Sequence, residues 1–356
     1  MERIFCQGNE AIGWGAVSAG CLHFFGYPIT PQNEVTEWFA RELPKRGGCF
    51  VQSEAENATA AMVHGAAATG VRVMSSTASP GWGLMQEQLS NIIAAEVPCV
   101  IVNVQRGGPG QGSTQHAQMD YLQTTRGPHG GCRSMVLAPA SVQEIHDLMQ
   151  LAFYLADKYR LLTVLLMDAI VGQTYEPLEI KTIEFGPLPE KDWALKGTDR
   201  KGGRCDLIFT GQGVVGNYLG YLEHVDNKQK QITASEVRYE CYRMDDNPAL
   251  AIVAYGYTSR VSLDVVDRAR AEGFKVGLIR PISLWPFPYD VVKEAASQGC
   301  KLLVVEDSLG QLVEDVKLAA EGKTEVHLLG MLARHLTSGS GMILPDRVYE
   351  EVKKLL

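Results

Sequence analysis

Cysteine pairs with the spacing of metal ligands are missing from this sequence. Its eight cysteines are scattered singly along the chain, and no C-x-x-C pair occurs among them. Because zinc ribbons and ferredoxin-type clusters are held by closely spaced cysteines, the sequence argues against either group within this chain. We expect the cysteines to be small buried residues of a protein from a reducing compartment.

Long apolar runs and an excess of positive charge are missing as well. The longest apolar stretches, such as LLTVLLM, have the length of a strand, whereas a membrane helix needs about 18 apolar residues. The formal net charge is −8, so no basic stripe is available to neutralise nucleic-acid phosphates. The first residues, MERIFCQGNEAIGWG, lack the basic segment and apolar core of a secretory signal. We therefore expect a cytoplasmic protein that binds neither nucleic acid nor membrane.

Apolar β-branched segments alternate with alanine-rich helical patterns along most of the 356 residues. This alternation predicts an α/β fold with parallel sheets covered by helices, and the chain is long enough for two such domains. We expect one α/β domain over residues 1–180 and another over 248–356. Residues 181–247 have little periodicity and many turn residues, so we expect a connector or a surface excursion there.

Two prolines bracket a threonine in YPITP, residues 27–31. The segment follows the strand-like CLHFFGYP and precedes an amphipathic helical pattern. One interpretation is local: Thr30 caps a helix whose first position is Pro31, where a missing N–H costs nothing. The other interpretation is that the rigid turn aims Thr30 at a ligand beyond the carboxyl end of the strand.

Two carboxylates stand at the start of the next predicted helix, in QSEAEN. Ser53 and Glu56 have the spacing of a capping box, and an acidic residue near a helix N-terminus is favourable, so a structural role explains Glu54 and Glu56. The helix over 53–70 is rich in alanine and glycine, however, which predicts that another backbone or a planar ligand packs closely against it.

Arg106 follows the apolar strand PCVIVNVQ (98–105) and opens the loop RGGPGQGS. Such an arginine can pair with a carboxylate or a phosphate, and the glycines allow a ligand to approach the backbone. The alternative is a surface arginine beside a flexible loop. The glycines fit neither G-x-G-x-x-G nor a Walker A sequence, so they alone do not indicate a nucleotide site.

The remaining polar candidates have structural interpretations that are at least as good as functional ones. His64 lies inside the alanine-rich helix and is interpreted as a core histidine with a satisfied hydrogen bond. His116 and Asp120 are four residues apart and could face a site, although a solvated helix start explains them better. Glu306 and Asp307 end a predicted strand, where they either cap it or contact the site of a partner.

Together, YPITP, QSEAEN with VHGAAATG, NVQRGGPG and VGLIRPISLWPFP resemble one family along nearly the whole chain. The sequence is similar to the α subunits of thiamine-diphosphate-dependent 2-oxoacid:ferredoxin oxidoreductases. The resemblance is greatest to the 2-oxoisovalerate (branched-chain) type and next to the 2-oxoglutarate type. It implies a pyrimidine-binding (PYR) domain with a parallel sheet, followed by an α/β domain like the C-terminal domain of transketolase.

The resemblance also implies roles for individual residues. Glu56 matches the activating glutamate that binds N1′ of the cofactor's aminopyrimidine, and Pro28 and Ile29 would contact thiamine diphosphate. A carboxylate at N1′ favours the imino tautomer, whose 4′-nitrogen takes the C2 proton of the thiazolium. Arg106 would neutralise the substrate carboxylate and Thr30 would orient the substrate, as the matching residues do in the pyruvate enzymes. No metal ligand in this chain is implied.

The implied reaction needs more than this chain. The family converts a 2-oxoacid and coenzyme A to acyl-CoA, CO₂ and reduced ferredoxin. This sequence has no G-D-G…N motif for Mg²⁺ and the diphosphate, and no clustered cysteines for [4Fe-4S] clusters. The resemblance therefore implies a β subunit with the diphosphate and Mg²⁺ site and a ferredoxin-like subunit or ferredoxin. Thiamine diphosphate would be shared between the α and β subunits.

Two alternatives remain open at the level of sequence. The chain could be the pyrimidine-domain subunit of another thiamine enzyme, such as a decarboxylase or a transketolase-like half. It could also be a non-catalytic assembly subunit that retains the fold. Residues 105–108 and the extended loop GQGSTQHAQMDY differ from the pyruvate enzymes, so the substrate cannot be transferred from them.

Overall fold

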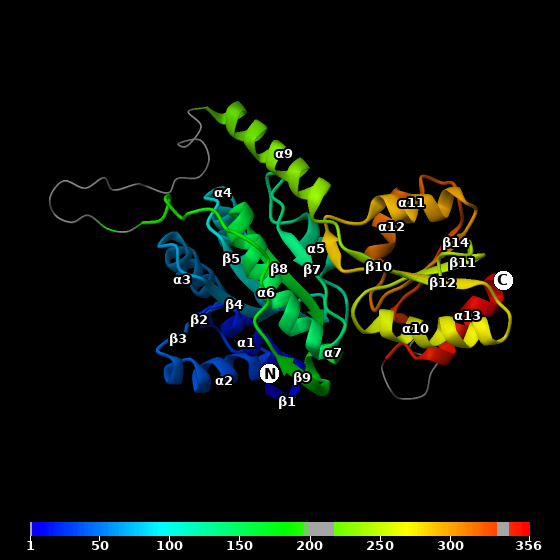
Figure 1. Cartoon of the computed structure of the whole chain (residues 1–356), viewed down its shortest axis with the longest axis horizontal. Coiled ribbons are helices and arrows are strands. Elements are labelled where there is room, and N and C mark those ends of the chain that lie inside the picture. Colours follow the sequence, from blue (N-terminus) through cyan, green and yellow to red (C-terminus); the bar gives the residue numbers. More distant parts are fainter. Residues whose placement is uncertain (1, 196, 198–216, 333–341) are drawn as a thin grey trace.

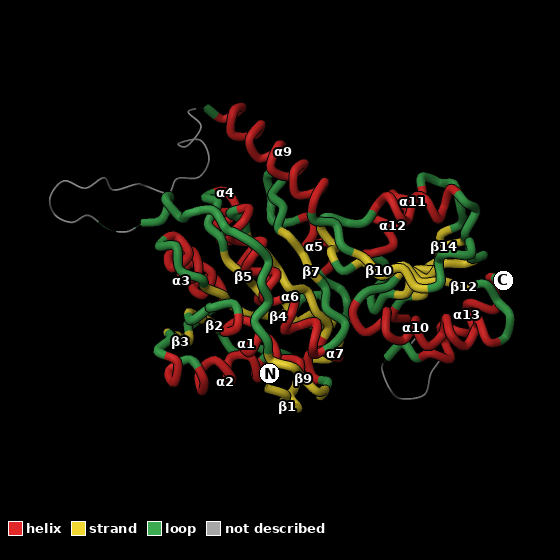
Figure 2. The backbone as a smooth tube through the Cα atoms, viewed as in Figure 1, coloured by secondary structure: helices red, strands yellow, loops and turns green. Residues whose placement is uncertain are grey.

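The protein has two α/β bodies that lie side by side (Figure 1). The computed structural model describes residues 2–195, 197, 217–332 and 342–356. Each body has a sheet in its centre and helices on both faces, as the tube in Figure 2 shows by its yellow strands between red helices. The predicted α/β class with parallel sheets is confirmed.

The larger body contains an eight-stranded sheet. Its strands are β2 (His23–Gly26), β3 (Cys49–Gln52), β4 (Val73–Ala78), β5 (Cys99–Gly107), β6 (Ser113–His116), β7 (Met135–Leu137), β8 (Leu162–Asp168) and β13 (Ser283–Trp285). The order is β13-β7-β8-β5-β4-β2-β3, with β6 paired to β5 beside this path. All pairs from β7 to β3 are parallel, whereas β13 and β6 are antiparallel additions. Because β5 is buried on both faces, its sequence is apolar without alternation.

Helices cover both faces of this sheet. One face carries α1 (Gly8–Ser18), α2 (Asn33–Glu42) and α6 (Val142–Tyr159), and the other carries α3 (Glu56–Ala68) and α4 (Ser79–Ala94). A short 3-10 helix, η1 (Pro44–Arg46), follows α2, and α5 (Tyr121–Arg126) and α7 (Ala169–Gln173) lie near the second body. The two apolar clusters that result stabilise the sheet from both sides.

The smaller body contains a five-stranded sheet in the order β10-β12-β11-β14-β15. Its strands are β10 (Tyr239–Tyr242), β11 (Leu250–Val253), β12 (Val276–Pro281), β14 (Lys301–Val305) and β15 (Val326–Leu329), and only β10 is antiparallel to its neighbour. α10 (Gly256–Ala271) and α13 (Pro345–Leu355) cover one face, and α11 (Tyr289–Ser297) and α12 (Leu312–Ala320) cover the other.

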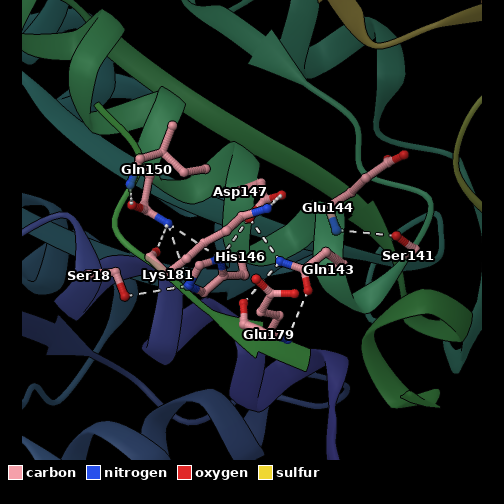
Figure 3. Close-up of polar contacts among 10 residues, drawn as sticks. Ser18, Ser141, Gln143, Glu144, His146, Asp147, Gln150, Glu179 and Lys181 are labelled. Atoms are coloured by element: carbon pink, nitrogen blue, oxygen red, sulfur yellow. Dashed lines mark hydrogen bonds and ion pairs between the residues drawn. The ribbon is translucent and has the colours of Figure 1, made fainter. Parts of the chain in front are cut away.

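Polar side chains of α6 bind the segment through which the chain leaves the larger body (Figure 3). This segment begins with β9 (Tyr175–Ile180), which pairs with the first strand, β1 (Glu2–Gln7), in a separate two-stranded ribbon. Gln143 Oε1 accepts the N–H of Glu179 at 2.9 Å, and Gln150 Nε2 donates to the carbonyl oxygen of Lys181 at 3.0 Å. These contacts fix the chain where it turns away from the sheet.

The described part of the predicted connector contains regular structure. Helix α9 (Tyr218–Ser235) lies across the larger body, where Lys228 Nζ donates to Glu96 Oε1 at 2.8 Å. Strand β10 then joins the smaller body by pairing with β12. Residues 181–247 therefore contribute one strand to the second sheet, which their weak periodicity did not indicate.

Glu306 has a structural role at the end of β14. Its fully buried carboxylate accepts the backbone N–H groups of Gln311, Leu312 and Val313 at 2.9, 3.0 and 3.0 Å. These are donors at the start of α12 that have no partner within the helix. Of the two interpretations made for Glu306, the structure supports the capping role, and the cap belongs to a helix.

We expect Glu306→Ala to lower the free energy of unfolding by about 3 kcal/mol, because it leaves several buried N–H groups without an acceptor. Glu314→Ala is the matched control, since Glu314 is an exposed acid in the first turn of the same helix. The control should change stability by less than about 0.5 kcal/mol. Urea unfolding of both variants measures the difference, and equal losses would contradict the capping role.

Candidate active site

Four neighbouring parallel strands bring the candidate residues to one edge of the large sheet. The residues that follow β2, β3 and β4 and that end β5 are, in this order, Thr30, Glu56, Ser79 and Arg106. Because the carboxyl ends of parallel strands meet at one edge, residues that are far apart in sequence converge there. We therefore place the candidate functional site at this edge of the sheet.

Glu56 is the first residue of α3 and is only 7% exposed. The capping-box interpretation is wrong: the N-cap is Ala55, and Ser53 Oγ instead donates to the Ala55 carbonyl oxygen at 3.0 Å. Within the described ranges the Glu56 carboxylate has no hydrogen-bond or ion-pair partner, while its neighbour Glu54 is exposed. A buried carboxylate without a partner is costly, which points to a group from outside this chain.

Gly81, in the first turn of α4, lies directly against Glu56. A Cβ at this glycine would lie 2.2 Å from Thr77 Oγ1, 2.6 Å from Glu56 Oε1 and 2.7 Å from Glu56 Cγ. The glycine is therefore required for the close approach of α4 to the carboxylate, and its φ is not positive. His64 makes a further contact between the two helices, since its Nδ1 lies 2.8 Å from Gln88 Nε2. Burial lowers the pKa of this half-buried histidine, in agreement with a structural role.

The small residues of α3 have two different environments. Ala60, Ala67 and Ala68 are buried in the core, whereas Ala61 and Gly65 are exposed, and a Cβ at Gly65 would meet nothing within 4 Å. The predicted close neighbour is thus found on the inner face of α3, where the described chain itself packs against the helix.

Arg106 is 6% exposed, so the surface-arginine interpretation is wrong. Its Nη1 donates to the carbonyl oxygen of Thr30 at 2.8 Å, and its Nη2 donates to that of Gln111 at 2.9 Å. The structure therefore brings Thr30 and Arg106 together. Within the described residues the guanidinium has no ion-pair partner, and its buried Nε has no hydrogen-bond acceptor. A buried positive charge remains available to an anion.

Thr30 does not cap the following helix. That helix, α2, begins at Asn33, and its N-cap is Gln32, a fully buried residue whose Nε2 donates to the Tyr27 carbonyl oxygen at 3.2 Å. Gln32 thereby stabilises the turn that contains exposed Pro28 and half-buried Ile29. The side chain of Thr30 is exposed and makes no hydrogen bond with any described residue. Its hydroxyl group is free to contact a ligand.

Sequence reasoning missed a polar network beneath Arg106. Ser79 Oγ accepts the backbone N–H of Arg106 at 2.9 Å and donates to Asp120, which also accepts Asn103 Nδ2 at 3.1 Å. Asp120 is 3% exposed, so its interpretation as a solvated helix start is wrong. Burial raises the pKa of Asp120 to about 6, while hydrogen bonds from Ser79, Asn103 and Gln123 act in the opposite direction. Asn103 inside the apolar run CVIVNVQ was the available signal.

A cleft of about 830 Å³ opens beside this network. Its wall includes the first turn of α4, the glycine-rich loop, the segment before α5 and one side chain from the second body; the lining residues are Ser79, Pro80, Gly83, Gly108, Pro109, Gly110, Gln111, Met119, Asp120, Leu122, Gln123 and Gln311. The lining has no basic residue, and its one charged side chain is Asp120. The cleft can therefore hold an apolar or neutral group next to the buried Arg106.

The second body fixes the segment that forms this wall. Gln311 Nε2 donates to the carbonyl oxygen of Met119 at 2.6 Å, and Gln118 exchanges backbone and side-chain hydrogen bonds with Asp307. His116 Nδ1 lies 2.8 Å from Asp307 Oδ2. His116 belongs to β6 and not to a helix with Asp120. Asp307 thus connects the two bodies of the chain.

The described residues hold no group of three or more His, Cys, Asp and Glu side chains that could bind a metal ion. Seven cysteines in the described ranges are free, and Cys49 and Cys241 are exposed, contrary to the expected burial. In the described part of the chain, every helix is too short or too polar to span a membrane.

Comparison with known proteins identifies two sequence families in the chain. Residues 14–243 match pyruvate flavodoxin/ferredoxin oxidoreductase, thiamine-diphosphate-binding, and residues 249–340 match pyruvate:ferredoxin oxidoreductase core domain II. Among curated relatives, ketoisovalerate oxidoreductase subunit VorB of Methanothermobacter thermautotrophicus is 44% identical over 94% of this chain and 95% of that protein. The 2-oxoglutarate synthase subunit KorA of Methanothermobacter marburgensis is 35% identical over 99% of this chain and 98% of that protein.

Solved structures support the same assignment. The 2-oxoglutarate:ferredoxin oxidoreductase from Magnetococcus marinus, with 2-oxoglutarate, coenzyme A and succinyl-CoA bound, matches with a TM-score of 0.87 and 27% identity. The match covers 99% of this chain but only 65% of that one. An inactive β4 tetramer of a split-gene transketolase matches with a TM-score of 0.62 and 17% identity over 98% of both chains, which indicates a shared fold alone. The predicted fold is therefore confirmed.

Gly81→Ala tests the close approach of α4 to Glu56. We expect this substitution to lower the free energy of unfolding by about 1–3 kcal/mol, because the new methyl group overlaps the Glu56 carboxylate. Gly83→Ala is the control in the same helix, where a Cβ would meet nothing within 4 Å, and it should leave stability unchanged or raise it by up to about 1 kcal/mol. Thermal and urea unfolding compare the two. Equal stabilities would contradict the close packing of Gly81 against Thr77 and Glu56.

Proposed function

The chain belongs to the pyruvate flavodoxin/ferredoxin oxidoreductase family, and from this membership we propose that it is the α subunit of a 2-oxoacid:ferredoxin oxidoreductase. The complex would carry out the oxidative decarboxylation of a 2-oxoacid with coenzyme A, in the cytoplasm, to give acyl-CoA, CO₂ and reduced ferredoxin. One observation supports this function most strongly. Two buried charged side chains that have no ion-pair partner among the described residues, Glu56 and Arg106, lie at the same sheet edge.

Glu56 is the proposed catalytic residue that contacts the cofactor. The residues present fit thiamine diphosphate, because the Glu56 carboxylate has no partner in the described chain and lies directly against Gly81 of α4. When bound, the cofactor supplies a carbon nucleophile for the oxo group. Glu56 would hold a proton at N1′ of the aminopyrimidine, and the exposed turn with Pro28 and Ile29 would contact the ring system.

Arg106 and Thr30 are the proposed substrate-binding residues. The Arg106 charge is unpaired in the described residues and is held in place by two backbone carbonyl groups, so it can attract the substrate carboxylate without rearrangement. The free hydroxyl of Thr30 lies on the residue whose carbonyl oxygen Arg106 contacts. It can donate a hydrogen bond to the same substrate and orient it.

A branched-chain 2-oxoacid such as 2-oxoisovalerate is the proposed substrate in preference to 2-oxoglutarate. The relative that carries ketoisovalerate in its name is 44% identical, compared with 35% for those named after 2-oxoglutarate. The cleft beside Arg106 adds a physical reason. Its lining has no basic side chain to pair with a second carboxylate, and Asp120 would repel one when it is ionised.

The remaining parts of the reaction are proposed to reside on other chains. Diphosphate and Mg²⁺ would be bound by a β subunit, so that thiamine diphosphate lies between the two chains. Electrons would leave through [4Fe-4S] clusters of partner subunits to a ferredoxin-like subunit or to ferredoxin. The buried Glu56 without a partner supports this arrangement, because a group from outside the chain would supply the missing hydrogen bond.

Glu56→Gln tests the catalytic role in the complex assembled with its partner subunits. We expect the rate of 2-oxoacid-dependent viologen reduction to fall by about 10²- to 10⁴-fold, because the amide cannot hold the proton as the carboxylate does. Assembly and thiamine diphosphate content should be retained. Glu54→Gln is the control, since Glu54 is two residues away and exposed, and it should keep the wild-type rate. An assembly subunit without a catalytic role would tolerate both substitutions.

Substrate preference is measured with the same wild-type complex. We expect kcat/KM for 2-oxoisovalerate to exceed that for 2-oxoglutarate at least about tenfold, since a second carboxylate in the cleft would lose its hydration without gaining a cation. Initial rates of viologen reduction with coenzyme A give both constants, and pyruvate serves as a short apolar reference. A preference for 2-oxoglutarate would refute the proposed substrate class.

A further inference from the structure

Asp120 is a buried carboxylate at the wall of the cleft that the proposed mechanism does not yet use. It is 3% exposed and lines the cleft together with Ser79 and Gln123. Although it precedes α5, its side chain makes no capping hydrogen bond to that helix. Its carboxylate accepts hydrogen bonds from Ser79 of α4, from Asn103 of β5 and, at 2.7 Å, from the side chain of Gln123 in α5.

The hydroxyl group of Ser79 connects Asp120 to Arg106. The Ser79 hydroxyl group can donate one hydrogen bond, and two acceptors lie within reach of it. They are Asp120 Oδ2 and the Arg106 carbonyl oxygen, which is 3.1 Å from Ser79 Oγ. An ionised Asp120 is the stronger acceptor, so the proton is directed to Asp120. The lone pairs of Ser79 are then directed to the backbone N–H of Arg106 at 2.9 Å. The backbone N–H of Asp120 in turn donates to Gln105 Oε1 at 3.1 Å, which attaches Asp120 to the same strand.

We propose that Asp120 is a positioning residue for Arg106: its ionised carboxylate orients Ser79 and thereby fixes the end of β5, from which the Arg106 side chain reaches Thr30. The inference rests on the proposed function, because it concerns the arginine that would bind the substrate carboxylate. Protonation of Asp120 removes the strongest acceptor of Ser79 and frees its hydroxyl to turn to the Arg106 carbonyl oxygen. The lone pairs of Ser79 are then turned away from the backbone N–H of Arg106, and the strand end loses that hydrogen bond.

The surroundings of Asp120 decide in which pH range this happens. Burial raises its pKa to about 6, against the hydrogen bonds from Ser79, Asn103 and Gln123 and the charge of Arg106. Tyr255 from the smaller body also interacts with Asp120, and burial raises the pKa of this tyrosine well above its usual value, so that it stays neutral. Substrate binding should therefore weaken as the pH falls through about 6.

Asp120→Asn is the test, in the complex assembled with its partner subunits. We measure kcat and KM for 2-oxoisovalerate by viologen reduction between about pH 5 and about pH 8. Wild type should lose kcat/KM below about pH 6, mainly through KM. The variant should have about tenfold to hundredfold lower kcat/KM at neutral pH, and this acidic decline should be absent. A variant that keeps the wild-type decline, or a wild type without one, overturns the proposal.

Asp168→Asn is the matched control. Asp168 is fully buried, and burial also raises its pKa to about 6, but its carboxylate accepts the N–H groups of Tyr257 and Val171 and none near Arg106. The control should keep the acidic decline of kcat/KM. If Asp168→Asn abolishes the decline and Asp120→Asn does not, the titrating group is Asp168 and the proposal is wrong.

Ser79→Ala provides an independent route if Asp120→Asn does not assemble. It removes only the bridging hydroxyl group, so it should abolish the acidic decline as well. The loss of kcat/KM in the double variant should be no larger than that in the more impaired single variant, because both substitutions break the same connection. Additive losses overturn the proposal. Absence of any 2-oxoacid-dependent turnover in the wild-type complex would overturn the proposed function itself, and the two failures are thus distinguishable.

Equilibrium unfolding of the full chain supplies a readout without turnover. The pKa of Asp120 is raised in the folded state, so its contribution to stability is fully present below about pH 4 and is lost as the pH rises through about 6. As the pH rises over this range, the urea midpoint of wild type should therefore fall relative to that of Asp120→Asn. At higher pH the difference between the two midpoints should stay constant. Parallel midpoints throughout would show that Asp120 does not titrate in the network.

Discussion

The candidate site depends on a buried positive charge that has no counter-ion among the described residues. Arg106 is 6% exposed, and within the described residues its guanidinium donates only to neutral oxygen atoms of Thr30 and Gln111. A charge in such a place is tolerated only when several dipoles point at it from fixed positions. The end of β5, the turn after β2 and the glycine-rich loop therefore have to be held rigidly, and much of the surrounding structure serves this purpose.

The second α/β body contributes to this rigidity. Three hydrogen bonds attach the segment between Arg106 and α5 to the smaller body. Gln118 Nε2 donates to the Tyr255 carbonyl oxygen just after β11, Gln118 Oε1 accepts the N–H of Asp307 just after β14, and Gln311 Nε2 donates to the Met119 carbonyl oxygen. The loop that contacts Arg106 is thus fixed at one end by the large sheet and at the other by the small one. A substitution at the boundary between the two bodies can therefore affect a site that it does not touch.

The sequence predicted the sheet edge better than it predicted the contacts there. The convergence of Thr30, Glu56 and Arg106 follows from parallel strands alone, because each of these residues stands just after or at the end of an apolar strand. The helix starts at Ser53 and Pro31 were wrong by two or three residues, since capping signals compete and tertiary contacts of Gln32 decide between them. Asp120 could not be predicted, because its burial depends on the pairing of β4 with β5 and on the second body.

Whether a buried polar side chain has a partner within the fold explains why the sequence and the structure both indicate a site that another molecule completes. A polar side chain that a fold buries for its own stability finds partners inside the fold, as Glu306 does at the start of α12. Glu56 is buried to a similar degree, yet no described residue donates to it, although Gly81 keeps it in place. A carboxylate that is buried but unsatisfied lowers the stability of the isolated chain. Its position makes physical sense when a nitrogen heterocycle completes the pocket, which is the role that we propose for it.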